Sequence, residues 1–139
     1  MRLFLDSSVL LAACGSPTGA SREIFQRAGR NKWSLICTHY GCQEVAENLA
    51  ATGSEGVTAW PTLLPQLIVK DDILTLDLPV VFEPAKDRPI LLSAYAWADV
   101  LLTLDKADFG VLMGAPFYGL IVSTPGRFLK KERLEGRLV

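Results

Sequence analysis

Residues 87–109 read DRPILLSAYAWADVLLTLDKADF, and this stretch decides the fold that we expect. Asp87 opens an apolar segment, which predicts that a helix begins there. Residues 100–103 form a short apolar run that predicts a buried strand, and Asp105 and Asp108 follow closely after it. Like charges that share one site raise one another's pKa, so a group of carboxylates such as this usually needs a cation.

The alternation of short strands and helices continues on both sides of this stretch. Strands are expected at residues 2–6, 33–37, 78–82 and 120–123, and helices at residues 7–13, 21–30, 38–51, 57–69 and from 125. The segment from Gly53 to Gly56 is expected to break the chain, and Pro65 to bend or end the helix around it. This alternation predicts an α/β fold, a three-layer α/β/α sandwich with a mainly parallel central sheet of about four to five strands. The 139 residues fit a single domain, residues 1–139.

Acidic residues recur at the expected junctions between strands and helices. They are Asp6 after the first strand, Glu44 early in the helix after the second, Asp87 before the next helix, and Asp105 after the following strand. Because ligands of parallel sheets bind outside the carboxyl ends of the strands, all four acids can reach one rim. Carboxylates without His or Cys partners favour Mg²⁺ or Mn²⁺. Such ions activate water and neutralise phosphate charge, which predicts phosphodiester hydrolysis.

Each acid alone also fits an ordinary structural role. Asp6 and Asp87 stand where a helix N-cap or first-turn acid is favoured. Glu44 shares its helix face with Glu47 one turn later, which competes for the same role. Asp105 is also a common kind of turn residue after a strand. The metal-site hypothesis therefore depends on the shared placement of the acids.

The charge balance limits how the chain could bind nucleic acid. Fourteen Lys and Arg residues oppose fifteen Asp and Glu residues, so an RNA partner must be held by a local basic patch. The candidate patches are Arg22, Arg27, Arg30 and Lys32, and separately Arg127, Lys130, Lys131, Arg133 and Arg137. Runs of this kind also form ordinary solvated helix faces, and that alternative stays open.

Cysteine usage and hydropathy indicate the compartment. The three cysteines include no C-x-x-C pair and there is one histidine, which argues against a zinc site with ordinary spacing. The apolar run at residues 3–5 is too short for a signal peptide, and no run approaches the length of a membrane span. We therefore expect a cytoplasmic protein with no membrane partner.

Three segments resemble the acidic motifs of PIN domains in order and spacing. They are MRLFLDSSVLL at residues 1–11, CQEVAENL at residues 42–49, and the stretch at residues 87–109. The resemblance is to the stand-alone bacterial type, which includes the VapC toxins of toxin–antitoxin pairs, and it covers almost the whole chain. It implies a small parallel α/β/α sandwich and a Mg²⁺- or Mn²⁺-dependent endoribonuclease, the toxin of a type II toxin–antitoxin pair.

The resemblance also implies roles for individual residues and partners. The implied catalytic and metal-binding acids are Asp6, Glu44, Asp87 and Asp105. Asp108 matches an additional acid of the family, and Ser7 and Thr103 match hydroxyl residues that orient carboxylates or bound water. The implied partners are an RNA substrate, a small antitoxin protein and a second copy of the chain in a homodimer.

Two other classes of function fit part of the pattern. One is a catalytically weak PIN-like module that binds RNA or a protein and acts by occupancy, which the presence of all four acids disfavours. The other is a phosphotransfer receiver-like domain, which shares the α/β alternation. A receiver-like domain would be expected to show an acidic pair near the first strand and a lysine after the last. This chain has only Asp6 early, and residues 123–125 read STP.

Overall fold

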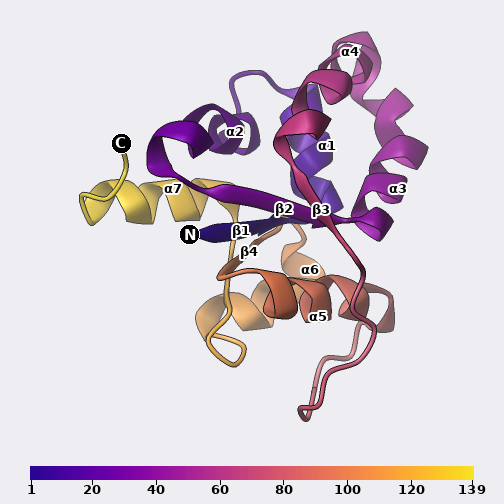
Figure 1. Ribbon diagram of the computed structural model, residues 1–139, viewed down its shortest axis with the longest axis vertical. Coiled ribbons are helices and arrows are strands. Elements are labelled where there is room, and N and C mark those ends of the chain that lie inside the picture. The colour runs from indigo at the N-terminus through magenta and orange to yellow at the C-terminus, as the bar shows by residue number, and fades with distance from the viewer.

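Five strands form one all-parallel sheet in the computed structural model, which describes residues 1–139 (Figure 1). In chain order they are β1 (Arg2–Leu5), β2 (Ser34–Thr38), β3 (Ile68–Lys70), β4 (Val100–Leu102) and β5 (Ile121–Ser123). The spatial order is β3-β2-β1-β4-β5, which makes β1 the central strand. Leu3 of β1 pairs with Leu35 of β2 on one side and with Val100 of β4 on the other.

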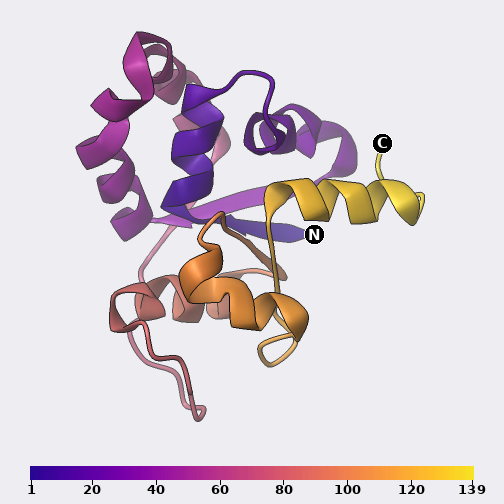
Figure 2. The same ribbon diagram turned by 180° about the vertical axis from the view of Figure 1, so that it is seen from behind.

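Helices cover both faces of this sheet (Figures 1 and 2). One face carries α1 (Ser7–Gly15), α2 (Ala20–Asn31), α3 (His39–Asn48), α4 (Gly53–Leu63) and α7 (Pro125–Leu134). The other face carries α5 (Arg88–Trp97) and α6 (Lys106–Phe109). Short 3-10 helices are η1 (Leu49–Thr52), η2 (Leu64–Gln66), η3 (Ala85–Asp87) and η4 (Gly110–Gly114). The predicted α/β/α sandwich is therefore confirmed. None of the helices has the length and apolar character needed to cross a membrane.

The core lies in two layers that the central strand separates. Leu3 and Leu5 of β1 belong to the cluster beneath α1, whereas Phe4 between them belongs to the cluster beneath α5. All three side chains are at most 1% exposed. Burial on both faces explains why the strands read as continuous apolar runs in the sequence.

The winding of the chain reverses beside β1. The chain first builds β2 and β3 on one side of β1, and it then returns to build β4 and β5 on the other side. Such a reversal leaves a crevice at the carboxyl ends of the two strands that flank it, here β1 and β4. We call this place the switch point. Asp6 and Thr103 are the first residues after those two strands.

The third strand does not lie where the sequence suggested. The helix predicted at residues 57–69 ends at Leu63, before Pro65 as expected, and Ile68 and Val69 belong to β3. Strand β3 pairs only with β2, so it is an edge strand. Ile68 and Val69 are 45% and 38% exposed, so this half-exposed apolar run also fits the spacing of the helix before it.

The strand predicted at residues 78–82 is also wrong. Residues 71–84 contain no strand, and they project from the sheet as a narrow loop (Figures 1 and 2). Val81 is 92% exposed, and Pro79 has no N–H group to donate to a ladder. A hydrogen bond of 2.7 Å from the Tyr118 hydroxyl to the Pro79 carbonyl holds the loop. The segment is apolar, but it has no strand beside it.

The break predicted at residues 53–56 falls at Gly53 alone, and residues 54–56 are already helical. Gly53 has a φ of 83°, and α4 begins there directly after η1. Gly56 is buried within α4, where an added Cβ would overlap the side chain of Thr52. Gly56 therefore permits a close approach between α4 and η1.

Candidate metal centre

Asp6 lies at the switch point and is held by three hydrogen bonds. It is the N-cap of α1, with Oδ1 accepting from the Ser7 N–H at 2.7 Å. Oδ2 accepts from the Ser8 hydroxyl at 3.1 Å and from the Thr103 hydroxyl at 2.7 Å. Asp6 is 7% exposed, and this burial raises the pKa of its carboxyl, against the effect of the three hydrogen bonds. The N-cap role does not exclude a second role, because Asp6 also joins the ends of β1 and β4.

Glu44 reaches the same rim from α3. Its Oε1 accepts a hydrogen bond of 3.2 Å from the Ser7 hydroxyl, so Ser7 links Glu44 to Asp6. Burial raises the pKa of Glu44, and the charge of Asp6 adds to that shift. Glu47 is exposed and accepts a hydrogen bond of 3.1 Å from Gln43. Glu44, and not Glu47, therefore faces the switch point.

Three further carboxylates form a group at the end of β4. Asp87, Asp105 and Asp108 each offer one oxygen, and these oxygens lie within 4.8 Å of one another. We call these residues the acidic triad. Asp105 is the N-cap of α6, and its Oδ1 accepts from the Asp108 N–H at 3.0 Å. Its own N–H donates to the Thr103 hydroxyl at 3.1 Å.

Asp87 differs from Asp105 because it makes no capping bond. It precedes α5, yet its side chain accepts no hydrogen bond from the first turn of that helix. Its Oδ2 is buried and has no hydrogen-bond partner. Burying a carboxylate oxygen without a partner is costly, so this oxygen suits a cation that would complete its contacts. An all-oxygen donor set of this kind fits Mg²⁺ or Mn²⁺.

The pKa values of two members of the triad shift in opposite directions. Burial, with the neighbouring Asp108 carboxyl, raises the pKa of Asp87 to about 7, whereas interaction with Asp87 lowers the pKa of Asp108. Lys86 Nζ lies 3.5 Å from Asp108 Oδ2, but the Lys86 side chain is 74% exposed. A screened lysine therefore offsets only part of the negative charge.

The acidic triad and the pair of Asp6 and Glu44 share one rim. The charge of Asp105 raises the pKa of Asp6, and the charge of Asp6 raises the pKa of Asp87. Of the four acids predicted from the sequence, only Asp87 and Asp105 lie within the group whose oxygens are 4.8 Å apart or less, and Asp6 and Glu44 lie outside that group. Asp108, expected as an auxiliary, lies within the triad itself.

Two residues near the acids were not singled out from the sequence. Ser8 donates to Asp6 and accepts a hydrogen bond of 3.1 Å from the Leu104 N–H, so it ties α1 to the segment after β4. Tyr40 is the second residue of α3, and burial together with the charges of Glu44 and Asp87 raises the pKa of its phenol. The position of Ser8 beside Asp6 was a weak signal for its role.

The basic residues of α2 do not flank these acids. Arg22 donates to the carbonyls of Ala13 at 2.6 Å and of Cys14 at 3.3 Å, where α1 ends. The remaining residues of this predicted patch are Arg27, Arg30 and Lys32. The first pairs with Glu23 at 2.6 Å, and the other two lie where α2 leads into the start of β2. The start of β2 is at the rim opposite the acids, so RNA contact through this patch gains no support.

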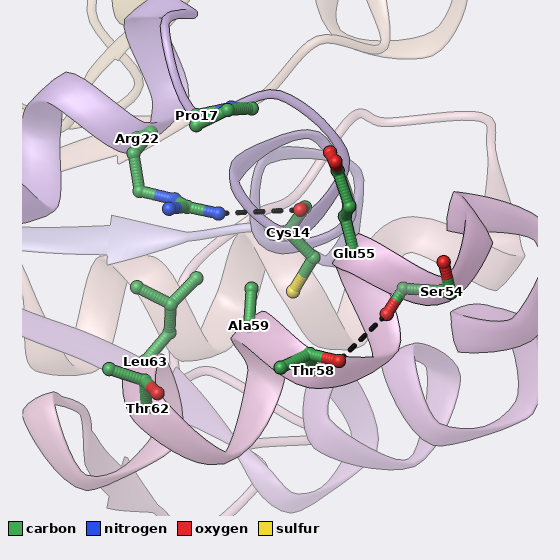
Figure 3. Close-up of a pocket in the computed structure, with 9 residues that line it drawn as sticks. All are labelled: Cys14, Pro17, Arg22, Ser54, Glu55, Thr58, Ala59, Thr62 and Leu63. Atoms are coloured by element: carbon green, nitrogen blue, oxygen red, sulfur yellow. Dashed lines mark hydrogen bonds between the residues drawn. The ribbon is translucent and has the colours of Figure 1, made fainter.

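A pocket of about 490 Å³ lies between the end of α1, α2 and α4 (Figure 3). Its lining residues are Cys14, Pro17, Arg22, Ser54, Glu55, Thr58, Ala59, Thr62 and Leu63. Arg22 extends toward the Cys14 carbonyl there (Figure 3). None of the five candidate acids lines this pocket, so it is separate from the candidate metal centre.

No protein-family model matches the chain, and no curated protein or solved structure matches it either.

Proposed function

We propose that this chain is a metal-dependent endoribonuclease that hydrolyses RNA phosphodiester bonds, and that it is the toxin of a type II toxin–antitoxin pair. The observation that carries the proposal is the acidic triad, Asp87, Asp105 and Asp108, within 4.8 Å beside the switch point. The resemblance to PIN domains supports RNA as the substrate. An antitoxin partner and a homodimer rest on that resemblance alone.

The carboxylates divide between two roles in this proposal. The acidic triad would hold the Mg²⁺ or Mn²⁺ ion, with the unpartnered Asp87 Oδ2 as one of its contacts. Asp6 and Glu44 would complete the site from β1 and α3. When bound, the ion would lower the pKa of water and neutralise charge on the scissile phosphate. Thr103 keeps the Asp6 carboxylate oriented through its 2.7 Å hydrogen bond.

Two side chains near the acidic triad are suited to accept a proton from water and to neutralise a phosphate charge. Glu44 has a raised pKa and uses only Oε1 for the bond from Ser7, so Oε2 is left to accept a proton from water. Lys86 is exposed beside the acidic triad and can neutralise an RNA phosphate. This lysine precedes Asp87 directly, so substrate and ion would meet at one segment.

Cleavage of labelled single-stranded RNA, with and without Mg²⁺ or Mn²⁺, tests the proposal. Asp87→Asn is the informative variant, because Asp87 makes no capping bond whose loss would disturb α5. Asp99→Asn is the matched control: Asp99 is an exposed acid paired with Arg2 at 3.0 Å, before β4 begins. We expect ion-dependent cleavage by the wild type and Asp99→Asn and its loss in Asp87→Asn.

Other outcomes separate the alternatives. Equal cleavage by the wild type and Asp87→Asn would exclude the acidic triad as the site. Ion binding measured by calorimetry, without cleavage of varied RNAs, would favour a binding module that acts by occupancy. Absence of both would reject the metal centre and the nuclease together.

A further inference from the structure

Two cysteines that the proposed function does not use lie next to each other at the junction of β2 and α3. The Sγ atoms of Cys37 and Cys42 are 3.4 Å apart. Cys37 is a fully buried residue of β2, and Cys42 is a half-buried residue in the first turns of α3. The third cysteine, Cys14, is buried in α1 and makes no such contact.

We infer that Cys37 and Cys42 are a thiol-oxidation site that forms a reversible disulfide within the chain. A disulfide has an S–S distance of about 2.05 Å, so the 3.4 Å gap must shrink by roughly 1.4 Å. Cys37 is the last but one residue of β2 and Cys42 is the fourth residue of α3, so side-chain rotation and a small shift of the first turn of α3 can supply this movement. The four intervening residues already turn the chain back so that the sulfur atoms meet.

The reaction balances with a low-molecular-weight disulfide as the oxidant. The Cys42 sulfur attacks one sulfur of that disulfide, forms a mixed disulfide and releases one small thiol. The Cys37 sulfur then attacks Cys42 Sγ, forms the internal S–S bond and expels the second small thiol. The two protein thiols together lose two hydrogens and two electrons, which the two small thiols carry away. Cys42 reacts first because it is half-buried, whereas Cys37 is fully buried.

The internal bond would act on the neighbouring acid, a consequence that rests on the proposed function. Glu44 follows Cys42 by two residues in α3, and its contact with Ser7 is 3.2 Å. A hydrogen bond of 3.0 Å from the Tyr40 N–H to Asp72 Oδ2 also holds the start of α3. Drawing Cys42 toward β2 moves this turn and therefore the Glu44 carboxylate. We expect RNA cleavage by the oxidised protein to be about tenfold slower or more, as when the groups that orient a ligand are disturbed.

The test uses the reduced full chain treated with oxidised glutathione, followed by thiol alkylation in denaturant and mass mapping. The expected product has a Cys37–Cys42 bond, one alkylated thiol at Cys14, and no retained glutathione. Reduction with dithiothreitol should restore all three thiols. A wild-type product with glutathione retained on Cys42, or a bond between two chains in its place, would overturn the inference.

Single variants separate the order of events. Cys37→Ser should stop at the mixed disulfide on Cys42, and Cys42→Ser should remain unmodified under the same treatment. Cys14→Ser is the matched control and should still form the internal bond. The wild-type mass map decides the matter even where a variant folds poorly.

The two proposals can fail independently. An internal disulfide in a protein that cuts no RNA in either redox form would leave the thiol site standing and reject the nuclease. Ion-dependent cleavage by a protein whose thiols all remain free after glutathione treatment would support the nuclease and reject the thiol site. Equal cleavage by both redox forms would remove the effect on Glu44 and keep the disulfide.

Discussion

The hydroxyl of Thr103 donates a 2.7 Å hydrogen bond to Oδ2 of Asp6, across 97 positions of the chain. Thr103→Val keeps the side-chain shape but removes this donor, and it also leaves the Asp105 N–H without its acceptor. We expect the free energy of unfolding to fall by about 1–3 kcal/mol, as for other buried polar groups left unpaired. Affinity for Mn²⁺ should fall by about 10–100-fold. Urea unfolding and calorimetric titration measure the two effects.

Thr58→Val is the matched control for that change. Thr58 is exposed on α4, and its hydroxyl donates to the Ser54 carbonyl at 2.9 Å. Loss of this hydrogen bond should change the free energy of unfolding by less than about 0.5 kcal/mol and leave ion binding unaltered. Similar losses from both variants would mean that Thr103 has no special part in orienting Asp6.

The raised pKa of Asp87 predicts how stability of the ion-free protein depends on pH. The pKa is about 7 in the folded chain and 3.8 in its ordinary state, so the folded protein binds the proton more tightly. The free energy of unfolding should therefore decrease as pH rises from about 4 to about 7. Burial raises the pKa of Asp6 and of Glu44, and both shifts act in the same direction.

Urea unfolding in the presence of a chelator, at pH values of about 5 and about 8, measures this dependence. Asp87→Asn cannot ionise at this position, so its stability should decline less between the two conditions. An unchanged decline in the variant would assign the pH dependence to other groups. Added Mg²⁺ should stabilise the wild type more at the higher pH, where Asp87 is deprotonated.

Lys86 provides a test that separates RNA contact from ion binding. Lys86→Gln removes the positive charge 3.5 Å from Asp108 Oδ2. RNA binding should weaken, and the slope of log affinity against log salt should fall by about 1. Mn²⁺ affinity should hold or rise, because a competing cation is gone. Filter binding over a salt series and calorimetry check both, and a loss of Mn²⁺ affinity would contradict the expected role.

The space around Gly56 and Gly29 predicts opposite effects on stability when each is replaced by alanine. In Gly56→Ala the new Cβ overlaps the Thr52 side chain, so we expect a loss of about 1–3 kcal/mol from overpacking. Gly29 lies exposed in α2 with open space around it, so Gly29→Ala should raise stability by about 0.5–1 kcal/mol. Thermal or urea unfolding compares them. A stabilised Gly56→Ala would show that α4 and η1 separate easily.

The buried strands β1, β2 and β4 could be predicted from the sequence, and so could the edge strand β5, whereas the edge strand β3 could not. Strands β1, β2 and β4 are covered on both faces, and their continuous apolar runs report this directly. Ile68 in β3 is half-exposed and follows a helix closely, so its run fits either period. The opposite error occurs at Val81, where an apolar run that resembles a strand lies in an exposed loop. Apolar character alone does not say whether a partner strand is present.

The candidate metal centre was predictable as far as it depends on strand ends. Asp6 and Asp105 follow strands that could be recognised, and a parallel sheet brings such ends to one rim. The parts contributed by Ser8 and Lys86 depend on where segments far apart in the chain meet. No local pattern contains that information. The contact of Cys37 with Cys42 likewise depends on how β2 turns into α3.

The central position of β1 also sets when the candidate centre can exist during synthesis. Strand β1 leaves the ribosome first, and β2 and β3 can pair beside it while the rest is still being made. Its other neighbour, β4, begins only at Val100, and the acidic triad surrounds that strand in sequence. A nascent chain that ends before Val100 therefore carries Asp6 and Glu44 without Asp105 and Asp108. Any activity at this rim is withheld until residues 100–108 have been made.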